Sequence, residues 1–208
     1  NLIIPNSIKG KPYPFQLKGI EFMLKVGSGI ISDDMGLGKT IEAICYAECI
    51  SSVRTLVICP ASLKWNWKKE IEAWTNKKAS FLGDGLDYSY QITNYEALID
   101  RAKIVSTEKG SKKERVLDQS KIMPHILNQK WDLIILDEAH KIKNQKAKQT
   151  KAVQKIHSLF KYHCLLTGTP LLNRPIELFP LLNYVAPQKW NNFFRYAKEF
   201  CGAYQGRW

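Results

Sequence analysis

The feature that most restricts the possible folds of this chain is the loop at residues 32–40, which follows the short apolar run 29–31. Its sequence is Ser-Asp-Asp-Met-Gly-Leu-Gly-Lys-Thr, and a helical pattern comes directly after it. A strand, a glycine-rich turn, Lys-Thr and a helix together indicate a phosphate-binding loop. Gly36 and Gly38 allow backbone amides to turn toward an anion, and the positive end of the helix faces the same place. The general pattern G-x-x-x-x-G-K-[ST] has glycine where this chain has Asp33, so the match is incomplete on its own.

The residue types within this loop predict nucleotide binding. We expect the ammonium of Lys39 to reach the β- and γ-phosphates, and the hydroxyl of Thr40 to ligate Mg²⁺. An ordinary glycine-rich turn is the alternative, but it does not account for Gly-Lys-Thr at a strand-to-helix junction. The predicted nucleotide-binding residues of the loop are Asp34, Met35, Gly36, Leu37, Gly38, Lys39 and Thr40.

The composition is that of a globular protein with a basic surface. The chain has 208 residues, of which 45% are hydrophobic and 24% are charged, which suffices for one large domain. Its net charge of +12 favours a polyanionic partner, nucleic acid before membrane, over a merely basic protein. No apolar run approaches the length of about 18 residues that spans a bilayer. Because the chain starts at Asn1 without a basic or apolar leader, we expect no signal peptide here and a piece of a longer protein.

The five cysteines are scattered along the sequence. A zinc site needs two Cys or Cys/His pairs at a suitable spacing, and the sequence does not contain two such pairs. We therefore expect reduced thiols in an intracellular protein, with no disulfide framework and no metal cluster.

Apolar runs alternate with helical patterns along most of the chain. This alternation predicts an α/β fold with one mostly parallel sheet. The expected strands are 29–31, 54–60, 79–82, 88–93, 131–136 and 162–166, and the expected helices are 14–24, 39–50, 63–74, 175–179 and the start of the stretch 190–208. Ser62 is expected to cap the helix that starts at residue 63.

Two segments are strongly basic. Residues 101–121 carry seven Lys and Arg against three acids, and we predict an exposed, mobile insertion there, more as a solvated loop than as a nucleic-acid contact. Residues 141–161 carry seven lysines and no acid, and Lys148, Lys151 and Lys155 share one helical face.

The acids after the apolar run 131–136 complete the predicted nucleotide site. In a parallel sheet the carboxyl ends of the strands share one edge, where ligands bind. Asp137 is expected to be the Walker B carboxylate that holds Mg²⁺ opposite Thr40, and Glu138 to orient or deprotonate the attacking water. A helix N-cap is the alternative for these acids alone, and the Gly-Lys-Thr loop argues against it.

Several motifs now resemble one family. The segment Asp137-Glu138-Ala139-His140 matches motif II of superfamily-two helicases, residues 167–170 resemble motif III, and residues 14–16 resemble the Q motif. The loop at 33–40 resembles motif I of SWI/SNF-type DNA translocases, a family that usually has Asp in place of the expected glycine. Residues 59–63 with Trp67 and Glu70 resemble motif Ia, and residues 93–95 resemble motif Ib. The resemblance covers residues 12–200, and segments near 174–178 and 196–201 are similar to the HARP-like annealing-helicase subgroup.

This resemblance implies a RecA-like P-loop NTPase fold, a three-layer sandwich, that uses ATP and Mg²⁺. It implies that Gln16 contacts adenine and that Lys39, Asp137 and Glu138 are catalytic. The implied coupling residues are His140, Thr167, Gly168 and Thr169, and the implied nucleic-acid contacts are Pro60, Ser62, Leu63, Thr93, Asn94 and Tyr95.

The same resemblance implies a domain plan. Residues 1–12 form a lead-in, 13–187 the first RecA-like lobe with the insertion near 101–121, and 188–208 the start of a helical extension. We expect the second RecA-like lobe to be absent, because the 38 residues after Pro170 cannot hold one.

The implied protein is the ATP-binding lobe of a translocase on double-stranded or forked DNA. The implied partners are that DNA and the second lobe of the same parent chain, with no membrane, in a monomer that is nuclear in a eukaryote and cytoplasmic in a bacterium or virus. Two alternatives remain open here: a lobe of a DEAH-type RNA helicase, and a stand-alone, non-catalytic module that binds nucleic acid or a partner.

Overall fold

A parallel sheet forms the centre of the protein. The computed structural model describes residues 2–99, 101–106, 113–118, 120–168 and 175–202. Six strands pair in parallel in the order β1-β8-β7-β2-β4-β3. The strands are β1 (Gly29–Ile31), β2 (Thr55–Cys59), β3 (Ala79–Phe81), β4 (Tyr90–Asn94), β7 (Leu133–Leu136) and β8 (Tyr162–Leu166). The predicted parallel α/β sheet is confirmed.

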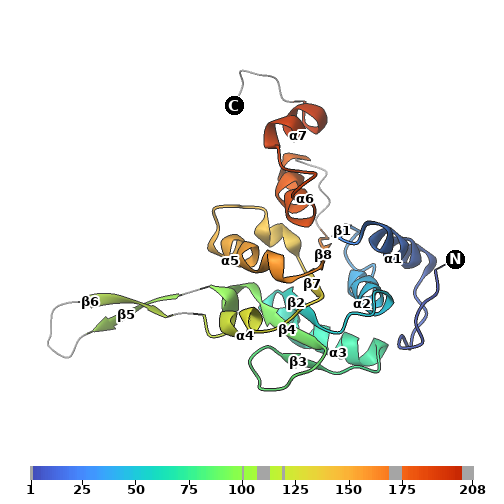
Figure 1. The fold of residues 1–208 in the computed structure, drawn as a ribbon, viewed down its shortest axis with the longest axis horizontal. Helices are drawn as coiled ribbons and strands as arrows, with labels where there is room; N and C mark the ends of the chain where they lie inside the picture. Colours follow the sequence, from blue (N-terminus) through green and yellow to red (C-terminus); the bar gives the residue numbers. More distant parts are fainter. Residues whose placement is uncertain (1, 100, 107–112, 119, 169–174, 203–208) are drawn as a thin grey trace.

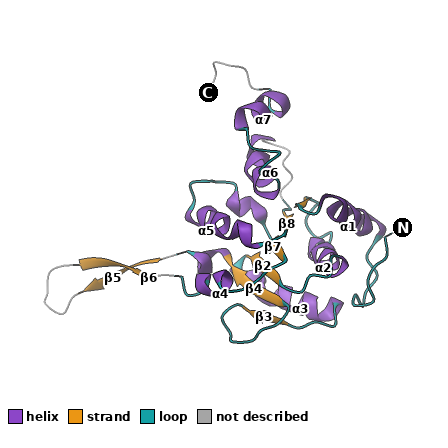
Figure 2. Cartoon of the chain, in the orientation of Figure 1, coloured by secondary structure: helices purple, strands orange, loops and turns teal. Residues whose placement is uncertain are grey.

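Helices cover both faces of this sheet (Figures 1 and 2). Buried side chains of α1 (Pro14–Val26), α2 (Lys39–Cys49) and α3 (Lys64–Trp74) pack on one face. Those of α4 (Met123–Leu127), α5 (Lys148–Ile156) and α6 (Phe179–Val185) pack on the other. Alternate residues of a strand point to opposite faces, so Val57 lies in the first core and Leu56 in the second. The result is the predicted three-layer sandwich, with α7 (Phe193–Phe200) following α6 at the C-terminal end.

The first residues of helices α1 and α3 can be compared with the starts that the sequence predicted. Helix α1 begins with Pro14 at its first position, where no amide is needed, and buries Ile20 and Met23. Helix α3 begins one residue later than predicted, because a 3-10 turn, η1 (Ala61–Leu63), precedes it. The amide of Leu63 donates to the carbonyl of Pro60 in that turn, and no side chain caps the helix. The predicted capping role of Ser62 is therefore wrong, and Ser62 is exposed.

The basic insertion forms a hairpin of its own. Strands β5 (Arg101–Ser106) and β6 (Lys113–Asp118) pair antiparallel in a separate two-stranded sheet. The hairpin projects away from the sandwich (Figure 1). The sequence predicted an exposed insertion in the form of a solvated loop, without strands. The short apolar stretches 104–105 and 116–117 favour strands instead, and they stand close to each other in the hairpin register.

Helix α5 carries the predicted basic face. Lys148, Lys151 and Lys155 are exposed, and the opposite side of the helix buries Val153 and Ile156. All five cysteines are free. None of the described helices combines the length and the apolar character needed to cross a bilayer.

Candidate nucleotide and nucleic-acid site

The predicted motifs meet at the carboxyl edge of the sheet. Because all six strands are parallel, the segments that follow them lie along one edge. The strand order arranges them as the loop 32–38 after β1, Gly168 after β8, Asp137 after β7, Pro60 after β2 and Tyr95 after β4. The predicted nucleotide residues therefore occupy one half of the edge, and the predicted nucleic-acid residues occupy the other.

The glycine loop has the backbone that its sequence demands. Gly36 and Gly38 have φ of 84° and 78°, in the left-handed region that favours glycine. A Cβ on Gly38 would also lie 2.6 Å from Nε2 of Gln16. The ammonium of Lys39 donates to the carbonyl oxygens of Asp33 (2.7 Å) and Asp34 (2.8 Å), so a phosphate would compete with these carbonyls for it.

Gln16 connects helix α1 to this loop. Its side chain is 2% exposed. Its Oε1 accepts from the amide of Tyr13 (2.9 Å), and its Nε2 donates to the carbonyl of Leu37 (3.0 Å). These two bonds give Gln16 a part in shaping the loop, while its contact with adenine stays a prediction.

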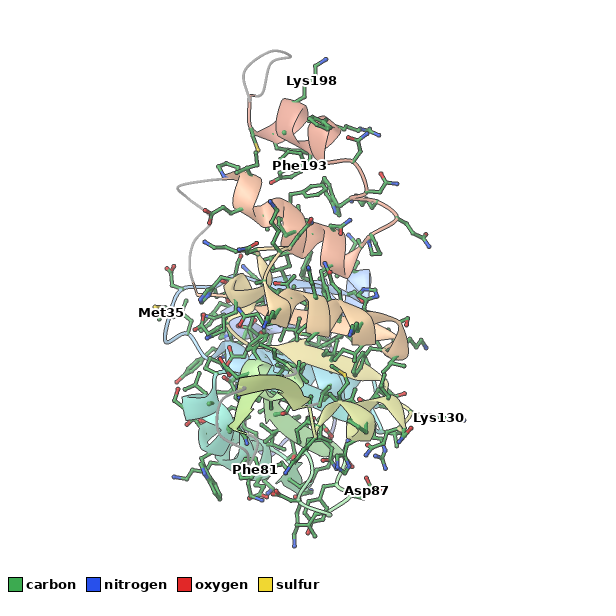
Figure 3. All side chains as sticks on the ribbon, turned by 90° about the vertical axis from the view of Figure 1, so that its left-hand side faces the viewer. Met35, Phe81, Asp87, Lys130, Phe193 and Lys198 are labelled. Carbon is green, nitrogen blue, oxygen red and sulfur yellow. The ribbon has the colours of Figure 1, made fainter. Side chains whose placement is uncertain are left out.

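The segment after β8 closes over the same loop. A Cβ on Gly168 would lie 2.8 Å from Cγ of Met35 and 3.4 Å from Nζ of Lys39, so glycine is needed there for a close approach. Thr167 is 2% exposed, and its amide donates to the carbonyl of Ile31. Thr169 lies outside the described residues. Met35 itself projects from the margin of the molecule, on the side opposite Lys130 in the view of Figure 3.

Asp137 is a buried carboxylate, 8% exposed, at the end of β7. Its Oδ2 accepts from the indole Nε1 of Trp67 (2.8 Å), and its Oδ1 accepts from the amide of Glu138 (2.9 Å). Burial raises the pKa of Asp137, and the hydrogen bond from Trp67 opposes that rise. Within the described part of the chain no cationic side chain forms an ion pair with it.

These residues fit a magnesium ion. A buried carboxylate without a cationic partner is costly unless a cation joins it. A carboxylate and the hydroxyl of Thr40 are the hard oxygen donors that Mg²⁺ prefers. Asp137 and Thr40 would hold the ion, and their role as its ligands stays a prediction.

Glu138 sits in a strained backbone conformation next to this carboxylate. Its φ is 51°, which a residue other than glycine seldom adopts and which is common at functional sites. Its Oε2 lies 3.1 Å from Nδ1 of His140. The predicted catalytic glutamate and the predicted coupling histidine are thus in contact within one motif.

The predicted nucleic-acid residues divide into two groups. Ser62 is exposed, and Pro60, Leu63 and Asn94 are half-buried. Asn94 donates to Oε2 of Glu96 (2.8 Å).

Thr93 and Tyr95 are 2% and 0% exposed, so their side chains do not reach the surface. The prediction that these two side chains lie along nucleic acid is therefore corrected. Strand β4 and the turn after it bury them, and the Tyr95 hydroxyl donates inward to the carbonyl of Asp137 (2.7 Å).

Two residues of the site were not predicted. Glu42 is buried on α2, where Gly19 of α1 leaves room for it: a Cβ on Gly19 would lie 2.3 Å from its Oε2. Burial, and then the charge of Asp33, raise the pKa of Glu42 to about 8. Trp67 is 1% exposed and donates its indole N–H to Asp137, a contact that its place in the motif Ia resemblance does not indicate. A tryptophan in a helix gives no sequence signal for the partner of its N–H.

Comparison with known proteins decides the family. The model of the SNF2-related domain matches residues 15–205. The chain belongs to the SNF2-related family. Among its relatives is the human DNA annealing helicase and endonuclease ZRANB3, 30% identical over 97% of this chain and 18% of that protein. The bovine SWI/SNF-related matrix-associated actin-dependent regulator of chromatin subfamily A-like protein 1 is 31% identical over 94% of this chain and 20% of that protein.

A solved structure supports the same family. The Sulfolobus solfataricus SWI2/SNF2 ATPase core in complex with dsDNA superposes with a TM-score of 0.75 and 27% identity, over 97% of this chain and 41% of that one. The fold is thus that of a part of an SNF2 ATPase core. The chain spans about a fifth of the length of the curated relatives named above. The family match favours the SNF2 interpretation over a DEAH-type RNA helicase.

Proposed function

We propose that this SNF2-family chain is the ATP-binding lobe of an ATP-dependent translocase on double-stranded DNA, with a role in DNA remodelling, repair or fork rewinding. The observation that carries the proposal is the order of the strand ends: the phosphate loop, Gly168 and Asp137 adjoin one another, and Pro60 and Asn94 continue the same edge. A nucleotide and a nucleic acid can therefore bind side by side on one rigid sheet.

The nucleotide half has a role for each side chain. Lys39 binds the terminal phosphates, and Thr40 and Asp137 hold Mg²⁺, which would neutralise phosphate charge when bound. Glu138 orients the attacking water or accepts its proton. The remaining loop residues cradle the phosphates through backbone amides.

The nucleic-acid half consists of the accessible residues Pro60, Ser62, Leu63 and Asn94. The net charge of +12 and the exposed lysines of α5 support a polyanionic partner. The structural neighbour that was solved with dsDNA supports a duplex as that partner.

We further propose that the lobe spans residues 13–187 and that residues 188–208 begin a helical extension. Hydrolysis would need a second RecA-like lobe, in keeping with the 41% of the archaeal ATPase core that this chain covers. We propose a monomeric protein inside the cell, nuclear in a eukaryote.

Lys39→Ala tests the nucleotide site. Loss of charge-assisted bonds to phosphate should weaken MgATP binding by about tenfold or more, while binding to duplex DNA stays within about twofold. Titration calorimetry with MgATP and a fluorescent duplex measures both affinities. Lys130→Ala is the matched control, because Lys130 is exposed and lies away from the loop (Figure 3).

Three results would overturn the proposal. A wild-type chain that binds DNA but not MgATP would be a non-catalytic module. Equal loss of both affinities in Lys39→Ala would mean that the loop has a structural role instead. Preference for RNA over duplex DNA in the same titration would restore the RNA-helicase alternative.

A further inference from the structure

Asp137 is held from both layers of helices, at its carboxylate from one and at its backbone carbonyl from the other. Trp67 belongs to the core beneath α1, α2 and α3, and it donates its indole N–H to Oδ2. Tyr95 belongs to the opposite core, and its hydroxyl donates to the backbone carbonyl of the same aspartate. Trp67 and Tyr95 are 1% and 0% exposed. Two buried aromatic residues on opposite sides of the sheet therefore converge on one residue of the nucleotide site.

Both aromatic residues lie near accessible residues of the predicted nucleic-acid segments along the chain. Trp67 lies in the first turn of α3, just after the exposed Ser62, and Tyr95 comes immediately after Asn94. Each hydrogen bond therefore connects the nucleic-acid half of the sheet edge to the nucleotide half. Trp67 follows β2, the neighbour of β7 in the sheet, and Tyr95 follows β4, which lies one strand further along.

We propose that Trp67 and Tyr95 are positioning residues for Asp137, which set its carboxylate for the metal ion and link that geometry to the nucleic-acid edge. The inference rests on the proposed function, because it takes Asp137 as the metal carboxylate. Neither residue touches the nucleotide or the metal. They act through the aspartate.

A carboxylate at a strand end can rotate unless hydrogen bonds fix it, and this is why Asp137 needs positioning residues. The amide of Glu138 fixes Oδ1 and the indole of Trp67 fixes Oδ2, so the plane of the carboxylate is set before a cation arrives. Because the indole N–H is neutral, it orients the carboxylate without competing with the metal cation for the negative charge. Partners of metal ligands that orient them in this way typically account for 10–100-fold in metal affinity.

A matched pair of substitutions tests the role of Trp67. Trp67→Phe removes the N–H and keeps an aromatic ring. Trp131→Phe makes the same chemical change at another buried indole, whose N–H donates to the carbonyl of Ile126 (2.9 Å). The experiment measures the dissociation constant of ADP for the 208-residue chain, once in EDTA and once at saturating Mn²⁺. We call the ratio of the first constant to the second the metal-dependent gain.

We expect Trp67→Phe to reduce this gain by about tenfold and Trp131→Phe to leave it within about twofold, although both lose stability. Metal-free ADP binding should be unchanged in both variants. Mn²⁺ electron paramagnetic resonance gives a second readout of the bound ion, independent of turnover.

The same design applies to the tyrosine. Tyr95→Phe removes the hydroxyl that holds the Asp137 carbonyl. Tyr90→Phe removes an equally buried hydroxyl, which donates to Oε1 of Glu48 (2.8 Å). Tyr95→Phe should reduce the metal-dependent gain by about threefold, less than Trp67→Phe because the bond is to the backbone, and Tyr90→Phe should not.

A double-mutant cycle tests whether Trp67 affects metal binding through Asp137 or independently of it. If Trp67 acts through Asp137, adding Trp67→Phe to Asp137→Asn should cause no further loss of the gain. The inference would be overturned if Trp67→Phe kept the wild-type metal-dependent gain, or if Trp67→Phe and Trp131→Phe reduced that gain equally. A wild-type chain without any metal-dependent gain would instead overturn the proposed function.

Discussion

Two tryptophans of helix α3 show how a single residue position decides between core and surface. Trp65 and Trp67 are two residues apart, so they point to different sides of the helix. Trp67 is 1% exposed, whereas Trp65 is 64% exposed and rests edge-on against Phe81, with ring centroids 4.7 Å apart. Trp67 is therefore a core residue and Trp65 a surface residue. Lys64 lies over the Phe81 ring, so the exposed indole stands among basic groups.

This difference predicts unequal costs of truncation. Trp67→Ala should destabilise the fold by about 3–5 kcal/mol, because it opens a cavity and leaves a buried carboxylate oxygen without its donor. Trp65→Ala should cost about 1 kcal/mol or less, the value of an exposed aromatic pair. Urea unfolding followed by circular dichroism measures both. Similar midpoints for the two variants would show that Trp65 packs in solution.

At the scale of elements, the sequence predicted those parts whose pattern is local. Strands β2, β7 and β8 are short apolar runs, β4 shows alternation, and the start of α2 follows from the loop chemistry. The first turn of α3 was not predictable from Ser62, because a 3-10 turn and a capped α-helix begin with the same residue types. The hairpin β5–β6 was missed because its charges outweigh its short apolar stretches. Burial of Thr93 and Tyr95 was missed because a motif resemblance carries positions, not the direction of side chains.

His163 of β8 and His157 of η4 (His157–Leu159) form a contact whose contribution to the stability of the fold depends on pH. The rings of His157 and His163 stack with centroids 4.2 Å apart. Ser28 and Tyr184 also face His163, and burial keeps that tyrosine neutral by raising its pKa. Burial, and then the neighbouring His157, lower the pKa of His163 to about 4, from its ordinary value of 6.5.

The sign of the pH effect follows from this shift. Between pH 6.5 and 4 the unfolded chain binds a proton at residue 163 that the folded chain does not, so this contribution to stability falls as the pH falls. The slope is about 1.4 kcal/mol per pH unit at most. The raised pKa of Glu42 acts in the opposite direction above its ordinary value of 4.5, so wild type must be compared with a variant.

We predict that the stability difference between wild type and His163→Gln shrinks as the pH is lowered from 7 to 5. Urea unfolding of both proteins at several pH values measures it, and the subtraction removes the contribution of Glu42. A difference that stays constant would mean that His163 is protonated with little cost in the folded protein.

At the scale of the whole molecule, the candidate site was the most predictable part. The parallel sheet brings Lys39, Asp137 and Gly168 to one edge, as their positions after apolar runs require. What the sequence did not indicate is the pair of hydrogen bonds that joins the two halves of that edge, since Trp67 and Tyr95 are far from Asp137 along the chain. Such bonds depend on how the layers stack, which no local pattern records.

The distribution of cations across the whole molecule leads to the last prediction. Lys39 is held near the expected phosphates, but the described arginine side chains lie elsewhere. Arg54, at the start of β2 on the opposite edge of the sheet, bonds to Asp87 and Gln129, and Arg195 lies on α7. An arginine at the transferring phosphate is worth about 10³–10⁵ in rate in related nucleotide hydrolases.

We therefore expect the 208-residue chain to bind MgATP but to hydrolyse it at least about 10³-fold more slowly than an SNF2-family protein with both lobes. Duplex DNA should not raise the rate, because the chain covers 41% of the archaeal ATPase core and the proposed second lobe would have to close on the nucleotide. A phosphate-release assay with and without DNA measures the turnover, and Glu138→Gln defines the background. Turnover that DNA stimulates to the level of a two-lobe enzyme, and that Glu138→Gln abolishes, would show that this lobe completes its own active site.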